Sequence, residues 1–168
     1  MLIISSLERA IDAFDRHKPT RAISLLSEEE EVPVFPGMTD ASHMRLYVEQ
    51  ESCAAAISAA AKARAHDLVE FAKNWDGQGN LLIHCKRGVA RSTAAALIVL
   101  CVMEPDTPEE ILLAKIRRAA PHADPCPLFV NYADDILGRN GRMIDAVEDL
   151  GPPITVISAP PATIQLAA

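Results

Sequence analysis

Several features that would point to a particular class of function are missing from this chain of 168 residues. No apolar run is long enough to cross a bilayer, and the N-terminus has neither the basic region nor the cleavage site of a secretory signal. The net charge of −7 disfavours nucleic acid and anionic membranes as partners, because the dominant electrostatic interaction would be repulsive. The cysteines and histidines show no zinc-ligand spacing. We therefore expect a cytoplasmic protein that binds neither nucleic acid nor membrane.

Aromatic residues are also scarce, at 4% of the chain, whereas alanine and leucine are abundant. This composition predicts more helix than strand, and the length suits one domain with a substantial core. Residues 151–168 contain four prolines and show no helical periodicity. We expect a single domain over residues 1–150, followed by an extended C-terminal tail over residues 151–168.

Short apolar runs and longer helical periodicities alternate along the domain. Together they predict an α/β fold, in which a central sheet of about four to five strands, mostly parallel, is flanked by helices and the C-terminal half is helical. An acidic run at 28–31 is interpreted as a solvated turn without a function. The expected strands are 2–5, 21–26, 44–48 and 81–84, and the expected helices are 7–17, 54–75, 92–103, 107–120, 128–137 and 142–150.

The segment HCKRGVARST, residues 84–93, joins the last apolar strand to a buried helix. Ligands of such sheets bind at the carboxyl ends of the strands, where backbone N–H groups at a helix N-terminus attract an anion. Gly88 permits a turn that a side chain would block, and Arg91 can donate two hydrogen bonds to a phosphate. Such donors favour the thiolate form of Cys85. The segment therefore predicts a phosphate-binding loop with its own nucleophile.

The spacing of Cys85 and Arg91, with His84 before and Ser92 after, resembles the H-C-x5-R-S/T signature of the cysteine-dependent protein tyrosine phosphatase superfamily. The compact size and the position of the motif past mid-chain are similar to its dual-specificity-like branch. The resemblance implies that branch's fold, a phosphocysteine on Cys85 and phosphate binding by Arg91. It further implies that Ser92 assists the departing thiolate, that His84 orients the loop, and that no metal or organic cofactor takes part. The implied backbone N–H donors are Lys86, Arg87, Gly88, Val89 and Ala90.

The resemblance also implies an aspartate as general acid, roughly thirty to thirty-five residues before the cysteine. Here that window, residues 50–55, reads QESCAA and contains no aspartate. Glu51 is its only carboxylate, and we expect it to serve as the acid. Two alternatives stay open: the acid is Glu49 or Asp40, or the chain has none.

The sequence thus predicts a phosphomonoester hydrolase that works through a phosphocysteine intermediate, namely a protein tyrosine or dual-specificity phosphatase. Its substrate would be a phosphorylated protein or a small phosphomonoester. One alternative is a catalytically weak or inactive phosphate-binding interaction module, which the missing aspartate supports. A second is a phosphoinositide phosphatase, because Lys86 and Arg87 add positive charge beside the loop. A third is a sulfurtransferase, since a cysteine-centred anion loop can also carry a persulfide.

Overall fold

A five-stranded sheet forms the centre of the protein in the computed structural model, which describes residues 1–48 and 59–167. The strand order is β3-β2-β4-β1-β5, and the first four of these strands run parallel. This arrangement confirms the predicted mostly parallel sheet. The strands are β1 (Leu2–Ser6), β2 (Arg21–Leu26), β3 (His43–Tyr47), β4 (Leu81–Cys85) and β5 (Ala162–Ile164).

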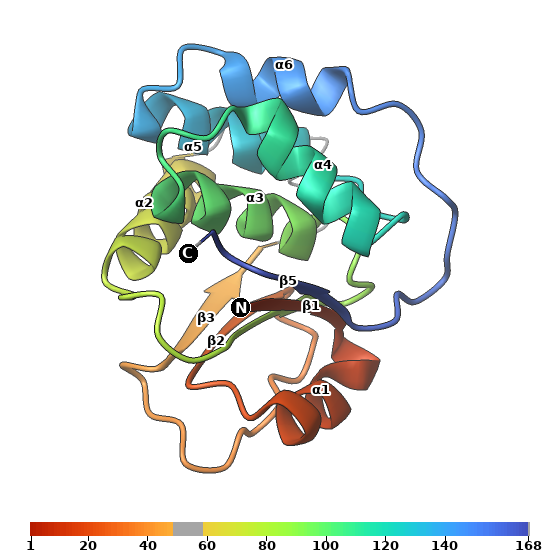
Figure 1. The fold of residues 1–168 in the computed structure, drawn as a ribbon. Coiled ribbons are helices and arrows are strands. Elements are labelled where there is room, and N and C mark those ends of the chain that lie inside the picture. Colours follow the sequence, from red (N-terminus) through yellow and green to blue (C-terminus); the bar gives the residue numbers. More distant parts are fainter. Residues whose placement is uncertain (49–58, 168) are drawn as a thin grey trace.

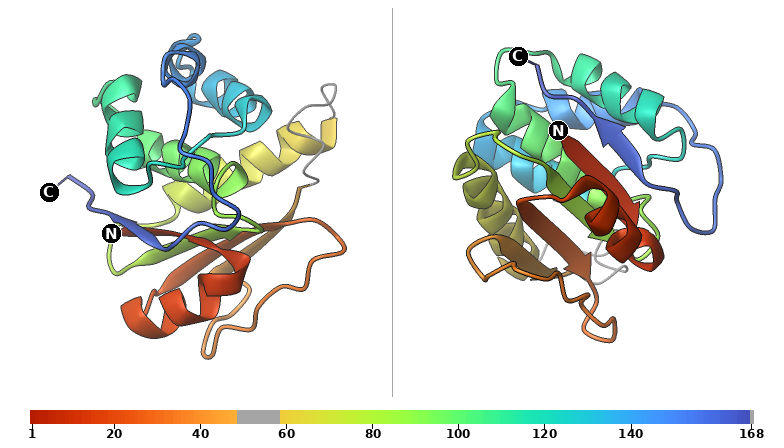
Figure 2. Two further views of the ribbon diagram at one scale, coloured as in Figure 1. Left: turned by 90° about the vertical axis from the view of Figure 1, so that its right-hand side faces the viewer. Right: turned by 60° about the horizontal axis from the view of Figure 1, so that its bottom comes forward.

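Helices cover the two faces of the sheet unequally (Figures 1 and 2). One face carries the short 3-10 turn η1 and α1, and the other carries α2 to α6 and most of the hydrophobic core. The predicted helical C-terminal half is therefore confirmed. The helical elements are η1 (Leu7–Arg9), α1 (Ala10–His17), α2 (Ala59–Lys73), α3 (Arg91–Met103), α4 (Glu109–Ala119), α5 (Pro127–Leu137) and α6 (Arg142–Glu148).

The predicted helix over residues 54–75 is described from Ala59 onward, and its first residues lie outside the described part. Among the helices that the structure describes, none combines the length and the apolar character needed to cross a membrane.

The residues of strand β4 alternate between the two faces of the sheet. Its five residues are all buried, and successive side chains point to opposite faces. Ile83 and Cys85 belong to the core beneath α3, whereas Leu82 packs with Phe14 on the α1 side. His84 therefore points away from Cys85, toward Phe35, whose ring it meets edge-on at a centroid distance of 5.9 Å.

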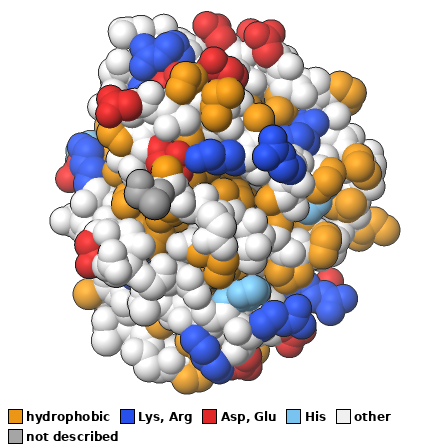
Figure 3. Space-filling model, viewed as in Figure 1, with side chains coloured by type: hydrophobic (Ala, Val, Ile, Leu, Met, Phe, Trp, Pro, Cys, Tyr) orange, Lys and Arg blue, Asp and Glu red, His pale blue; other side chains and the backbone are white. Residues whose placement is uncertain are grey.

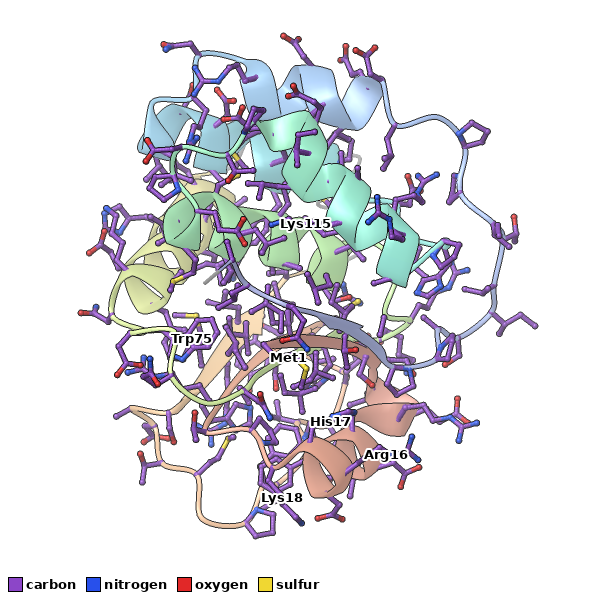
Figure 4. All side chains as sticks on the ribbon, viewed as in Figure 1. Met1, Arg16, His17, Lys18, Trp75 and Lys115 are labelled. Carbon is purple, nitrogen blue, oxygen red and sulfur yellow. The ribbon has the colours of Figure 1, made fainter. Side chains whose placement is uncertain are left out.

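The C-terminal residues return to the sheet after α6. Residues 162–164, which the sequence analysis assigns to the extended tail, form β5 and pair antiparallel with β1. The end is held further by the backbone N–H of Ala167, which donates to Glu104 at 3.0 Å, while Lys115 on α4 (labelled in Figure 4) pairs with the same carboxylate at 2.5 Å. The strand has only three residues, which is too few to show a periodicity, and it directly follows a pair of prolines. The sequence pattern therefore could not reveal it.

Candidate active site

The segment from Cys85 to Arg91, here called the phosphate loop, lies at the carboxyl end of β4, as the sequence predicts. Cys85 is the last residue of β4 and Arg91 the first of α3. At the centre of the loop, Gly88 has a φ of +73°, which L side chains rarely adopt. A Cβ on Gly88 would also lie 2.8 Å from the backbone nitrogen of Ser6. Glycine is therefore required here by both the backbone conformation and the available space.

The thiol of Cys85 is buried at the base of this loop, with 2% of the residue exposed. The N–H of Gly88 donates to Sγ at 3.3 Å, and the hydroxyl of Ser92 lies 3.2 Å from the same sulfur. Ser92 is itself fully buried in the first turn of α3. The nucleophile that the sequence suggests thus has two hydrogen-bonding groups directed at it.

The outer backbone atoms of the loop are tied to neighbouring segments. The carbonyl of Val89 accepts from the N–H of Asp124 at 3.0 Å, and that of Ala90 accepts from Cys126 at 3.3 Å. Among the described residues, no acceptor pairs with the loop N–H groups of Lys86, Arg87, Val89 and Ala90. Carbonyls bound on the outside and free N–H donors at a helix N-terminus are the arrangement that binds an oxyanion.

Arg91 is the loop's buried cation, with 4% of the residue exposed. One terminal nitrogen, Nη1, donates to the carbonyl of Val48 at 2.7 Å, and the other, Nη2, lies 3.5 Å from the carboxylate of Glu30. Val48 is the last described residue after β3, so the carboxyl ends of β3 and β4 meet at this guanidinium. The side chain is held at the loop before any ligand binds.

Glu30 is a member of the site that the sequence analysis missed. Its side chain is only 11% exposed and lies between the two cations Arg91 and Lys86, whose Nζ is 3.6 Å away. Burial raises the pKa of this carboxyl. The hydrogen bond from the backbone N–H of Ser27 and the two cations lower the pKa by more than burial raises it, so the pKa of Glu30 lies below its usual value. Glu30 follows β2, the direct neighbour of β4, so the strand order places it at the same sheet edge. The acidic run is therefore not wholly a solvated turn.

Behind the loop, two buried histidines share one hydroxyl group. Ser24 on β2 lies 2.6 Å from Nε2 of His84 and 2.8 Å from Nε2 of His43. Burial lowers the pKa of His84 to about 3 and that of His43 to about 4. Both imidazoles are therefore neutral near pH 7, and through Ser24 they link β2, β3 and β4 on the face of the sheet opposite the thiol.

The structure separates the candidates for the general acid. Asp40 precedes β3, and its side chain, which is 95% exposed, pairs with Arg45 at 2.7 Å. Because β3 runs parallel to β2 and β4, its N-terminal end lies at the edge opposite the phosphate loop. Asp40 is thus not brought to the site. Glu49 and Glu51 lie outside the described residues.

Within residues 1–48 and 59–167, no group of three His, Cys, Asp or Glu side chains is placed to hold a metal ion.

The comparisons with known proteins identify the fold. No protein-family model matches the sequence, and no curated protein matches it. Solved structures do match over most of both chains. Human DUSP28 is 18% identical with a TM-score of 0.64, covering 83% of this chain and 89% of its own. DUSP15 is 20% identical with a TM-score of 0.60, covering 89% and 92%. PTPMT1 is 16% identical with a TM-score of 0.58, covering 90% and 96%.

The matches also include the PTP-2 phosphatase of Cydia pomonella, which is 17% identical with a TM-score of 0.60, covering 80% of this chain and 84% of its own. The fold of this chain is therefore that of the dual-specificity-like branch of the cysteine-dependent protein tyrosine phosphatases, as the resemblance of the signature implies. At identities of 16–20%, this likeness establishes the fold and not the activity.

The position of Glu30 predicts that it opposes anion binding. Replacing Glu30 with glutamine removes a negative charge beside the loop, whereas Arg91 keeps its shorter bond to Val48. We expect the dissociation constant for inorganic phosphate, measured by calorimetry at pH 7, to fall about three- to tenfold. Glu29→Gln, which changes an exposed neighbour, should leave it unchanged. Weaker binding in the Glu30 variant would instead mean that Glu30 mainly orients Arg91.

The buried histidines predict a pH dependence of stability. Below pH 6.5 the unfolded chain protonates both rings, whereas the folded protein does so only near pH 4 and pH 3. The free energy of unfolding should therefore fall as the pH falls from 6.5 toward 4, by ~1.4 kcal/mol per pH unit for each ring. In urea titrations at several pH values, His43→Gln should flatten this slope, and His66→Gln, an exposed control, should not. An unchanged slope in the His43 variant would contradict this account.

Proposed function

We propose that this protein is a phosphomonoester hydrolase of the protein tyrosine or dual-specificity type that works through a phosphocysteine. The observation that carries the proposal is the placement of Sγ of Cys85 beneath the loop, 3.3 Å from the N–H of Gly88 and 3.2 Å from the hydroxyl of Ser92. A buried arginine lies at the same loop. A nucleophile, anion donors and a group that can protonate or stabilise the thiolate are thereby gathered at one point.

In the first step, the Cys85 thiolate attacks phosphorus, an S–P bond forms, and the bond from phosphorus to the ester oxygen breaks. The loop N–H groups and Arg91 carry the charge on the phosphoryl oxygens. The departing oxygen takes a proton from the general acid, which we assign to Glu51. Val48, three residues before Glu51 in the sequence, contacts Arg91, and this proximity along the chain supports the assignment.

In the second step, a water molecule attacks the phosphocysteine, an O–P bond forms, and the S–P bond breaks. The water loses a proton to the same carboxylate, and inorganic phosphate leaves. The hydroxyl of Ser92 donates to the sulfur as it regains its negative charge, which lowers the barrier to its departure.

The favoured substrate is a phosphorylated protein, with phosphotyrosine as the group removed. PTPMT1 has also been solved in complex with PI(5)P, and that structure matches this chain with a TM-score of 0.54 at 15% identity. Here, however, Lys86 pairs with Glu30, and the guanidinium of Arg87 donates to backbone carbonyls. Lys86 thus has a counter-ion, and the donors of Arg87 are directed to the carbonyls of Val156 and Ile157 and not to an additional phosphate of an inositol lipid, so we favour the protein substrate.

The nucleophile is tested with para-nitrophenyl phosphate, whose good leaving group makes little demand on the acid. We expect wild-type turnover at pH 5 to 8 and a loss of at least about a thousandfold in Cys85→Ser, because the hydroxyl is a far weaker nucleophile. Cys101→Ser, which changes a buried cysteine of α3, is the matched control and should remain active. A wild-type protein that binds phosphate without turnover would favour the interaction module.

The assignment of Glu51 is tested with two leaving groups. Glu51→Gln should slow hydrolysis of phenyl phosphate, whose poor leaving group needs a proton, by about a hundredfold. The rate with para-nitrophenyl phosphate should change much less, and the descending high-pH limb of the profile should flatten. Glu49→Gln, which removes the alternative acid, is measured in parallel. If the two variants lose the same activity on both substrates, Glu51 is not the acid.

A further inference from the structure

The segment from Gly151 to Pro161, here called the strap, crosses the side of the molecule between α6 and β5 (Figure 2, left). Its two isoleucines do not hold it in place, because Ile154 is 64% and Ile157 91% exposed. Apolar atoms accordingly gather along the right-hand edge of the space-filling view, where the strap runs (Figure 3). Hydrogen bonds to its backbone groups hold it instead. At its start, Arg117 donates to the carbonyls of Gly151 and Pro152, each at 3.1 Å.

At its other end the strap is bound to the phosphate loop. The guanidinium of Arg87 donates from Nε to the carbonyl of Ile157 at 3.1 Å and from Nη2 to that of Val156 at 2.5 Å. These two bonds use the planar fork of the arginine, which a lysine cannot reproduce. Arg87 therefore does not extend from the loop to meet substrate, although the sequence suggests a cation beside the anion site.

The strap in turn donates a hydrogen bond to the Arg87–Gly88 peptide unit, which lies next to Cys85. The N–H of Ala159 donates to the carbonyl of Arg87 at 2.8 Å. That carbonyl belongs to the same peptide unit as the N–H of Gly88, which donates to Sγ of Cys85 at 3.3 Å. Because a peptide unit is planar, fixing the direction of its carbonyl fixes the direction of its N–H. Hydrogen bonding at the carbonyl also polarises the unit and strengthens its donor.

Steric contact restrains the same unit. A Cβ built on Gly88 would lie 3.0 Å from the methyl group of Ala159 on one side and 2.9 Å from the backbone of Ser5 on the other. Glycine is conformationally permissive, so an unsupported peptide next to it can rotate. Ala159, which is 1% exposed, and β1 pack closely on both sides of Gly88 and thereby support this peptide.

We propose that Arg87 is a positioning residue: its side chain anchors the strap, and the anchored strap holds the Arg87–Gly88 peptide with its N–H directed at Cys85. The kinetic consequence rests on the proposed phosphatase function, because only turnover reveals it. The effect on the thiol does not require turnover and can be measured in an inactive protein.

The contact itself is tested with Arg87→Ala, Arg87→Lys and, as a control, Arg118→Ala, which changes an exposed arginine of α4. Hydrogen exchange of the Ala159 amide, followed by NMR, should be at least about tenfold faster in both Arg87 variants and unchanged in the control. The rate of alkylation of Cys85 by iodoacetamide at pH 7, followed by mass spectrometry, should fall in the Arg87 variants, because the N–H of Gly88 is no longer held against the sulfur.

Kinetic measurements then distinguish a positioning role of Arg87 from a role in which its charge attracts the substrate. The strap account predicts that kcat for para-nitrophenyl phosphate falls about fivefold or more in Arg87→Ala, independently of salt, and that lysine does not restore it. An effect on KM alone that weakens with salt and is rescued by lysine would overturn the proposal. Unchanged exchange of the Ala159 amide in Arg87→Ala would overturn it as well. An inactive wild type would contradict the phosphatase function, and exchange and alkylation would still decide the role of the strap.

Discussion

The peptide unit between Arg87 and Gly88 is the constraint on which the site depends. Its N–H points at the sulfur of Cys85, and its carbonyl is bound by a residue more than seventy positions later in the chain. A φ of +73° at Gly88 brings this unit into place, and the backbone of β1 closes the space behind it. The loop's geometry is thus set from three sides: by the end of β4, by the start of α3 and by the returning C-terminal segment.

Electrostatics around the loop are balanced before any anion arrives. The guanidinium of Arg91 is shared between a carbonyl of the β3 end and the carboxylate of Glu30. An incoming phosphate would have to replace Glu30 as the anionic partner of Arg91, and it would also be repelled by the charge of Glu30. The buried histidines, in contrast, contribute no charge near neutral pH, because burial lowers the pKa of both. Positive charge at the site therefore comes from arginine, lysine and oriented backbone dipoles.

Sequence patterns predicted the parts of this protein that depend on neighbours along the chain. The four parallel strands, the turn at Gly88 and the following buried helix each have a local signal. Contacts made across strands could not be predicted in the same way. Glu30 and His43 look like ordinary surface or packing residues until the order β3-β2-β4 places them beside the loop. The order of the strands is a tertiary property, which a single sequence does not reveal.

The same reasoning explains the C-terminal segment. Prolines and missing periodicity predicted an extended conformation, and residues 151–161 do carry no helix or strand. What they could not predict is where an extended chain lies, because its partners are backbone groups and an arginine side chain far away in the sequence. The residues of an extended segment do not indicate where it packs, even when, as here, it contacts the loop that carries the nucleophile.

Detection of the covalent intermediate tests the central claim most directly. Wild-type protein would be mixed with a phosphorylated substrate, quenched during turnover, and digested for mass spectrometry. This account predicts one phosphoryl group on the peptide that carries Cys85, with more of it in Ser92→Ala, in which the thiolate leaves more slowly. Turnover with no phosphoryl group on Cys85 in either protein would contradict the account, because it would mean that water attacks the substrate directly.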